Sequence, residues 1–326
     1  MTFHILLFLF SGFLLLWSSN WLVKGVTQIA RYLGWREFVI AFFVMAIVAS
    51  FPNLFVGVLA ALNGIPELSF GDIVGNSVVD FTLVAAIAVL VGKELKAEGP
   101  LIQKSLFFTI GVAILPLLLI LDRELGRGDA LVLLLVFLLY SAWLFSRRTE
   151  YTKVFNHAQT PLKPPFQRFR IFLQNMLKTL AAIGLLLASA EGVIRAIQFF
   201  VAEFHIPFVT VGILVLGLGS ALPEIYFTIA AARKGNNRVI LGDLMGSVIV
   251  MTTLVLGIVA LIHPIRIDDF SPYVLARFFL FLSAFAFLLF LRTNHAITRK
   301  EGAFLLFLYL VFVAGEVMIR ARLISL

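Results

Sequence analysis

Long uninterrupted apolar runs dominate this sequence and limit the folds that it can adopt. Segments such as FHILLFLFSGFLLLW and LVLLLVFLLYSAWLF contain no Asp, Glu, Lys or Arg. In hydrocarbon every backbone N–H and C=O must be paired within the protein, so only helices and closed barrels span a bilayer. The runs are continuous rather than alternating, which favours helices over barrel strands. The sequence therefore predicts an all-α polytopic membrane protein.

Ten stretches are long enough to cross a bilayer, which takes roughly 20 apolar residues for about 30 Å of hydrocarbon. They lie near 3–30, 37–62, 70–92, 101–121, 129–146, 170–202, 207–232, 239–263, 272–291 and 303–321. The first is interpreted as a span and not a signal peptide, because it lacks a basic n-region. The composition agrees, with 61% hydrophobic and 13% charged residues. The absence of Cys excludes disulfides and thiol chemistry.

The formal net charge of +8 could suggest a nucleic-acid partner, but Lys and Arg fall in short loops between the spans. Their distribution is a topology signal, since cytoplasmic loops are enriched in these residues. It predicts an integral protein of the plasma (inner) membrane with both termini outside and no nucleic-acid partner. The lipid bilayer is the expected partner, and the sequence predicts no oligomeric state.

An internal repeat organises the chain. Residues 49–91 align without a gap on residues 220–262, at a constant offset of 171 residues. The alignment superposes Pro52 on Pro223, Gly64 on Gly235, Gly71-Asp72 on Gly242-Asp243, Gly75 on Gly246 and Thr82 on Thr253. Five spans in each half would place the second copy in the membrane in the opposite sense to the first. We expect two inverted five-helix repeats at 1–147 and 170–326, joined by a basic cytoplasmic linker at 148–169, an architecture that recurs in secondary transporters.

Polar side chains within the spans indicate where such a transporter would bind its cargo. In each half the second span contains a proline, Pro52 or Pro223, at which we expect the helix to break. Broken helices expose carbonyl oxygens that bind ions when they line a cavity. Oxygen-bearing side chains flank both positions: Ser50, Asn53, Ser220 and Glu224. A carboxylate near the bilayer centre costs on the order of 2.5 kcal/mol or more, so Glu224 points to function.

The third span of each half adds a polar stripe. Asp72, Asn76 and Asp80 follow at i, i+4 and i+8, so they share one helical face. The second half has Asp243, Ser247 and Met251 at the matching positions. Adjacent glycines such as Gly71 and Gly75 should let another backbone approach closely. Asp72 and Asp243 lie near the start of their expected spans, so each could cap a helix or contact an ion directly.

These residues resemble the calcium/cation antiporters, which include the sodium/calcium exchangers. That superfamily carries a T-S-L-P-E-like segment and a G-N-x-x-G-S-N-x-x-N/D-like segment in each repeat. Here the first appears as ASFPN (49–53) and SALPE (220–224), and the second as GDIVGNSVVD (71–80) and GDLMGSVIVM (242–251). The resemblance implies ten helices and alternating-access exchange of Ca²⁺ or a related cation against Na⁺ or H⁺, with no cofactor. It implies as ion ligands Ser50, Asn53, Asn76, Asp80, Ser220, Glu224 and Ser247.

The chain departs from the superfamily pattern at two positions. Asn53 stands where glutamate is usual, and Met251 where a polar or acidic residue is usual. Asp80 adds a carboxylate where asparagine is typical, so we expect Asp80 and Glu224 to form the central pair. The oxygen-rich set suits Na⁺, Ca²⁺ or H⁺ better than zinc or copper.

Several alternatives remain open at this point. A divergent member could exchange a monovalent cation for protons, or a cation other than calcium. A channel of the same fold would conduct without a counter-ion. A membrane-embedded enzyme is disfavoured, because the five His residues lie at span ends or in loops and none is spaced with a second ligand as a zinc site requires.

Overall fold

The protein is described by a computed structural model that covers residues 1–32, 47–97, 100–146, 165–267, 271–293 and 295–324. Within these residues nine helices are long and apolar enough to cross a membrane. A tenth apolar helix, α3 (Phe51–Leu62), has 12 residues. It is the described part of the expected second span at 37–62, and the remainder lies outside the described residues. The all-helical prediction is confirmed.

The first half of the chain contains helices of very different length. They are α1 (Thr2–Tyr32), α3, α4 (Glu67–Val79), α5 (Ala85–Gly92), α6 (Pro100–Leu119) and α7 (Arg127–Ser146). A π-helical turn, Asp80–Val84, joins α4 to α5 so that the two form one continuous span. A short 3₁₀ turn, Ile120–Asp122, ends α6.

The second half also contains helices of different length. Its helices are α9 (Pro165–Phe204), α10 (Phe208–Val211), α11 (Gly217–Arg233), α12 (Asn237–Ile249), α13 (Leu256–Ile262), α14 (Ser271–Thr293) and α15 (Arg299–Ile324). π-helical turns at Gly212–Leu216 and Val250–Val255 join α10 to α11 and α12 to α13. The start of α9 takes in residues 165–169, which the sequence assigned to the linker; the rest of that linker, to residue 164, lies outside the described residues.

The 171-residue offset found in the sequence also relates the observed elements. The π-helical turn after α4 begins at Asp80 and that after α12 begins at Val250, one residue before the aligned position. Gly64 and Gly235, which are superposed by the offset, both adopt positive φ, 73° and 70°. A side chain there would crowd the following carbonyl, so glycine is favoured at both turns.

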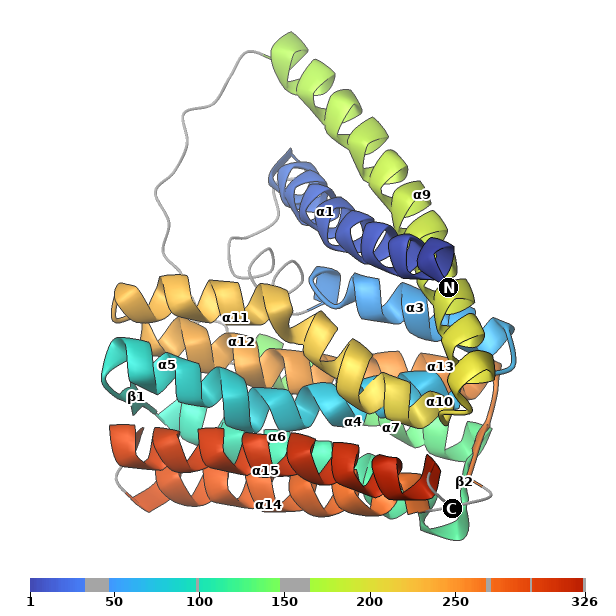
Figure 1. The fold of residues 1–326 in the computed structure, drawn as a ribbon. Coiled ribbons are helices and arrows are strands. Elements are labelled where there is room, and N and C mark those ends of the chain that lie inside the picture. The colour runs from blue at the N-terminus through green and yellow to red at the C-terminus, as the bar shows by residue number, and fades with distance from the viewer. Residues whose placement is uncertain (33–46, 98–99, 147–164, 268–270, 294, 325–326) are drawn as a thin grey trace.

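The axes of most helices are roughly aligned with one another, and α1 with α9 forms a tilted pair along one flank (Figure 1). α3 lies between this pair and the bundle and packs against α9. The main hydrophobic core fills the bundle around α4, α5 and α12 to α15, where Phe70, Phe81 and Phe287 are fully buried. Both chain ends lie at the same end of the bundle (Figure 1).

Two small antiparallel sheets tie the halves together at opposite ends of the bundle (Figure 1). β1 (Leu95–Lys96) pairs with β4 (Ala296–Ile297), and β2 (Glu124–Leu125) pairs with β3 (Ile265–Arg266). Each sheet therefore joins a loop of the first half to a loop of the second half, and the two loops are not superposed by the 171-residue offset.

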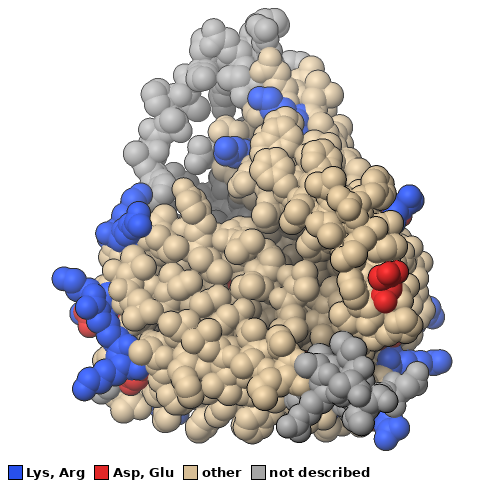
Figure 2. Space-filling model, in the orientation of Figure 1, with Lys and Arg blue, Asp and Glu red and all other residues tan. Residues whose placement is uncertain are grey.

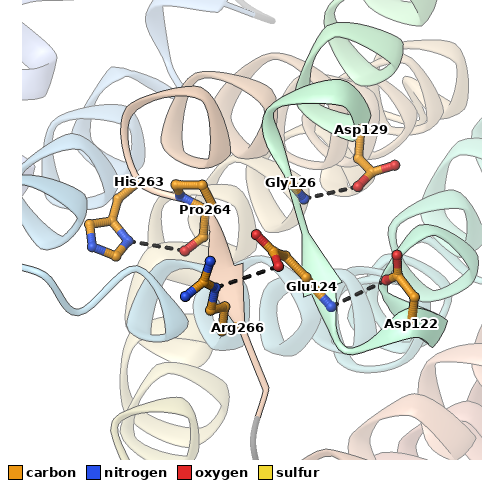
Figure 3. A network of polar contacts seen from close by, with 7 residues as sticks. All are labelled: Asp122, Glu124, Gly126, Asp129, His263, Pro264 and Arg266. Carbon is orange, nitrogen blue, oxygen red and sulfur yellow. Dashed lines mark hydrogen bonds and ion pairs between the residues drawn. The ribbon is translucent and has the colours of Figure 1, made fainter.

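The β2–β3 end carries a local polar network (Figure 3). Arg266 Nε lies 3.5 Å from Glu124 Oε2, and the Glu124 N–H donates to Asp122 Oδ1 at 3.2 Å. The Gly126 N–H donates to Asp129 Oδ2 at 2.9 Å. These exposed contacts fix the loop that enters α7, whereas Leu125 beneath them is fully buried.

Only one of the two proline positions behaves as predicted. α3 begins at Phe51 with Pro52 in its first turn, where a missing N–H costs no intrahelical bond. Pro223 instead lies inside the continuous helix α11, so the expected break there is wrong. The irregular backbone of this span is the π-helical turn Gly212–Leu216, upstream of the proline.

The glycine stripe of α4 makes the close backbone contact that the sequence predicted. A Cβ built on Gly71 would lie 2.3 Å from the Val209 carbonyl oxygen, and one on Gly75 would lie 2.3 Å from that of Ile213. Gly212 faces Leu68 in the same way. This interface sets α4 directly against the span that carries Ser220 and Glu224.

Charged side chains gather at the margins of the molecule. Figure 2 shows a broad face without Asp, Glu, Lys or Arg between charged groups at either end of the bundle. Many large apolar side chains of the long helices are exposed, including Phe107, Leu138 and Phe285. An apolar belt with charged ends is what a membrane-embedded bundle requires.

Candidate cation-binding site

The carboxyl groups of Asp80 and Glu224 meet near the middle of their respective spans. Asp80 is the first residue of the π-helical turn after α4 and is fully buried, while Glu224 projects from α11. The two carboxyls lie within hydrogen-bonding range of each other. Ser247 of α12 donates its hydroxyl to Glu224 Oε1 at 2.6 Å and is also within hydrogen-bonding range of Asp80. One span of the first half and two consecutive spans of the second half therefore converge here.

A chain of hydrogen bonds extends the site along α4. Asn76 donates from Nδ2 to Asp80 Oδ2 at 3.2 Å. The hydroxyl of Ser220 on α11 lies 3.0 Å from Asn76 Oδ1 and 3.1 Å from Asp72 Oδ1. Asp72 and Asn76 are buried. The polar stripe predicted for residues 72–80 is thus one connected network, bridged by a side chain from the other half.

Two oxygen atoms of the central pair have no hydrogen-bond donor among the described residues. They are Asp80 Oδ1 and Glu224 Oε2, and both atoms are buried. Ionised carboxylates only accept hydrogen bonds, so two of them can approach closely only if a proton or a cation lies between them. The arrangement is thus suited to a positively charged cargo.

Asp72 and Asp243 do not cap their helices. α4 begins at Glu67 and α12 at Asn237, so each aspartate lies beyond the first turn, where no free N–H groups remain. Asp243 is close enough to Glu224 for electrostatic interaction, as is Asp72. The capping alternative is therefore wrong, and both aspartates lie near the central carboxyl pair.

Asn53 and Met251, the two positions that depart from the superfamily pattern, contact each other. The Asn53 amide donates from Nδ2 to Met251 Sδ at 3.2 Å, and Met251 is fully buried in the π-helical turn after α12. Ser50, which precedes α3, is also buried. The sequence did not predict that Met251 contacts another polar residue, although its alignment with Asp80 in the repeat indicated a position at the site.

The atoms that could coordinate an ion are mainly neutral oxygens around a pair of carboxyl groups. Among the described residues no three His, Cys, Asp or Glu side chains converge as a preformed metal cluster. Serine hydroxyls, asparagine amides and two carboxylates are ligands that Na⁺ and Ca²⁺ accept, and such sites release their ions more readily than cages of several carboxylates.

The family model described as "Sodium/calcium exchanger protein" matches residues 3–146 and 176–318, which together make up most of the chain. The chain belongs to the sodium/calcium exchanger family. As an exchanger of this family it is a membrane-spanning secondary transporter, not an enzyme, and its activity is cation antiport. The resemblance drawn from the repeat motifs is confirmed.

Several relatives share this family at low identity. The chain is 24% identical to the sodium/calcium exchanger MaX1 of Methanosarcina acetivorans, over 96% of this chain and 98% of that protein. It is 25% identical to the putative antiporter CaxA of Alkalimonas amylolytica, over 78% of this chain and 79% of that protein. It is also 25% identical to the inner membrane protein YrbG of Escherichia coli, over 79% of each chain.

The fold is similar to that of a structurally characterised exchanger. Solved structures of the sodium–calcium exchanger NCX_Mj superpose on this chain with a TM-score of 0.62 at 22% identity, covering 96% of this chain and 98% of theirs. This likeness concerns the fold, and it covers nearly the whole arrangement of helices.

Proposed function

We propose that this exchanger moves Ca²⁺ or a related cation against Na⁺ or H⁺, with the cargo bound between Asp80 and Glu224. The observation that carries the proposal is the contact of these two buried carboxyl groups, each with one oxygen that lacks a donor among the described residues. Two negative charges at one point bind one divalent ion, two monovalent ions or protons. Ser247, Asn76, Ser220 and Ser50 would complete the oxygen shell, and Asp72 and Asp243 would attract cations toward it.

Two inverted repeats, 1–147 and 170–326, would create the site. The arrangement of the small sheets supports this relation. At an offset of 171 residues β1 corresponds approximately to β3, and β2 corresponds approximately to β4. Exchanging the two halves therefore converts the β1–β4 sheet into the β2–β3 sheet at the other end of the bundle. A two-fold axis in the membrane plane produces such an exchange of ends. Rocking of one group of helices against the other would then expose Asp80 and Glu224 to either side in turn.

We propose that both termini face the outside of the plasma (inner) membrane. Both chain ends lie at the β2–β3 end, so the opposite end, with Lys93 and Lys96, would face the cytoplasm (Figure 1). The chain has no Cys, so single cysteines can report this directly. In intact cells a membrane-impermeant maleimide should label Arg123→Cys and spare Lys93→Cys, and the opposite pattern would reverse the orientation.

The test of the cargo is counterflow in proteoliposomes. Vesicles loaded with Na⁺, or holding a pH gradient, are diluted into ⁴⁵Ca²⁺, and ²²Na⁺ uptake is followed in parallel. We expect ⁴⁵Ca²⁺ uptake that requires one of the opposing gradients. Flux that persists without any counter-ion would indicate a channel, whereas proton-driven ²²Na⁺ uptake alone would indicate a monovalent cation/proton antiporter.

Substitutions of Asp80 and Glu224 test whether these two residues form the cation-binding site. Asp80→Asn and Glu224→Gln should each lower the transport rate at limiting cation by at least about 30-fold, because each removes one of the two negative charges that would hold the cation. Glu191→Gln is a matched control, since Glu191 pairs with Arg195 on α9 at 2.7 Å, away from the pair. Wild-type rates in either site variant would exclude the pair as the binding centre.

A further inference from the structure

The contact of Asn53 with Met251 is the counterpart of the contact of Glu224 with Asp80. Asn53 and Glu224 are superposed by the 171-residue offset, and so are Asp80 and Met251. In each contact, the residue that directly follows a proline meets the π-helical turn of the other half. The site therefore contains two equivalent positions, of which one is built from two carboxyls and the other from an amide and a thioether.

The amide–thioether contact is electrically neutral and joins one N–H of the Asn53 amide to the sulfur of Met251. A thioether sulfur only accepts hydrogen bonds, so the N–H side of the Asn53 amide must face it. The 3.2 Å contact turns the N–H side of the amide toward the sulfur, and burial of Met251 excludes water from the sulfur. Hard cations bind carboxylate and carbonyl oxygens and avoid thioethers. This half of the site therefore offers a hard cation no charge, and of its two side chains only the amide oxygen of Asn53 is a fitting ligand.

We propose that Asn53 and Met251 are the residues that set the stoichiometry of exchange, by excluding a cation from one of the two equivalent positions. The inference rests on the proposed function and adds a limit to it. All transported charge is confined to Asp80 and Glu224, whose two carboxylates balance two positive charges. A third monovalent cation at about 4 Å from another would bind on the order of a thousand-fold more weakly, because neither Asn53 nor Met251 supplies a carboxylate to compensate its charge.

The exchange should therefore carry no net charge. One divalent cation in one direction is balanced by two Na⁺ or two H⁺ in the other. Asp72 and Asp243 do not alter this balance, since charges fixed to the protein return to their starting positions after each complete cycle. The net charge moved per cycle depends only on the difference between the two cargoes.

The test is the response of accumulation to a clamped membrane potential. In proteoliposomes clamped with K⁺ and valinomycin, about 100 mV acts on each net charge moved per cycle and would shift the steady-state ⁴⁵Ca²⁺ accumulation ratio roughly 50-fold. We expect the ratio of the wild-type protein to stay within about two-fold. A shift near 50-fold, with uptake still dependent on Asp80 and Glu224, would overturn this inference and leave the proposed function intact.

Two variants test the residues themselves. Asn53→Glu combined with Met251→Asp restores charge to the neutral position, and its accumulation ratio should become potential-dependent. Met251→Leu removes the sulfur and keeps an apolar side chain, and it should retain transport that is insensitive to potential. Loss of transport in Met251→Leu, with an unchanged melting temperature, would show that the thioether binds the cargo and would overturn the inference.

Calcium need not be the cargo for the inference to be tested. If only ²²Na⁺ moves against protons, the same clamp applies and one-for-one exchange should again ignore the potential. A wild-type protein that moves neither probe under either gradient would overturn the proposed function and this inference together.

Discussion

The hydroxyl of Ser247 donates to the carboxylate of Glu224 at 2.6 Å, from one span of the second half to another. This short, charge-assisted bond fixes the rotamer of the carboxylate that faces Asp80. Ser247→Ala should lower cation affinity by roughly 10-fold or more, as expected for loss of a hydrogen bond to a charged group. The measurement is the KM for ⁴⁵Ca²⁺ uptake. Ser146→Ala, whose hydroxyl bonds to the Trp143 carbonyl at an exposed helix end, should leave KM unchanged.

Gly75 cannot carry a side chain without moving a neighbouring span. Its Cβ would lie 2.3 Å from the Ile213 carbonyl oxygen, a contact that no rotamer change can relieve. Gly75→Ala should destabilise the protein by about 1–3 kcal/mol, or more, and reduce transport by separating α4 from the span that holds Glu224. Gly111→Ala in α6 is the matched control, because no described atom lies within 4 Å of its Cβ. Equal melting temperatures for the two variants in detergent would contradict the proposed packing.

Gly64 and Gly235 should respond to substitution alike. Both have positive φ, and neither has a described atom within 4 Å of a built Cβ, so only backbone strain opposes a side chain. Alanine at either position should cost about 1–2 kcal/mol of stability, and asparagine less, since it tolerates the left-handed region. Thermal unfolding of the four variants would check this. Alanine variants as stable as the wild type would show that these turns tolerate another conformation.

The β2–β3 connection should depend on its buried residue and not on its ion pair. Glu124 and Arg266 are exposed, so Glu124→Gln should change stability by less than about 1 kcal/mol. Leu125 is fully buried beneath them, and Leu125→Ala should cost about 2–5 kcal/mol. Melting curves at low and high salt would separate the two contributions. A larger loss for Glu124→Gln than for Leu125→Ala would reverse this assignment.

The sequence was sufficient to predict features that repeat along one helix or along the chain. Apolar length predicted the spans, and helical spacing predicted the stripe from Asp72 to Asp80. The offset of 171 residues aligns the two halves from the sequence alone. These features depend on neighbours within a few residues or on identity between two segments, and both can be read directly from the order of residues.

Only the tertiary structure decided which of these side chains meet. Pro223 lies in a continuous helix, because the irregular backbone is taken up by the π-helical turn before it. Ser220 bridges Asp72 to Asn76, and Asn53 pairs with Met251, across more than 140 residues of chain. Such contacts depend on the rotation and depth of each helix relative to its neighbours, which packing at points such as Gly71 and Gly75 determines. Helical spacing assigns a residue to a face of its own helix, whereas the partner of that face is fixed only when the helices pack.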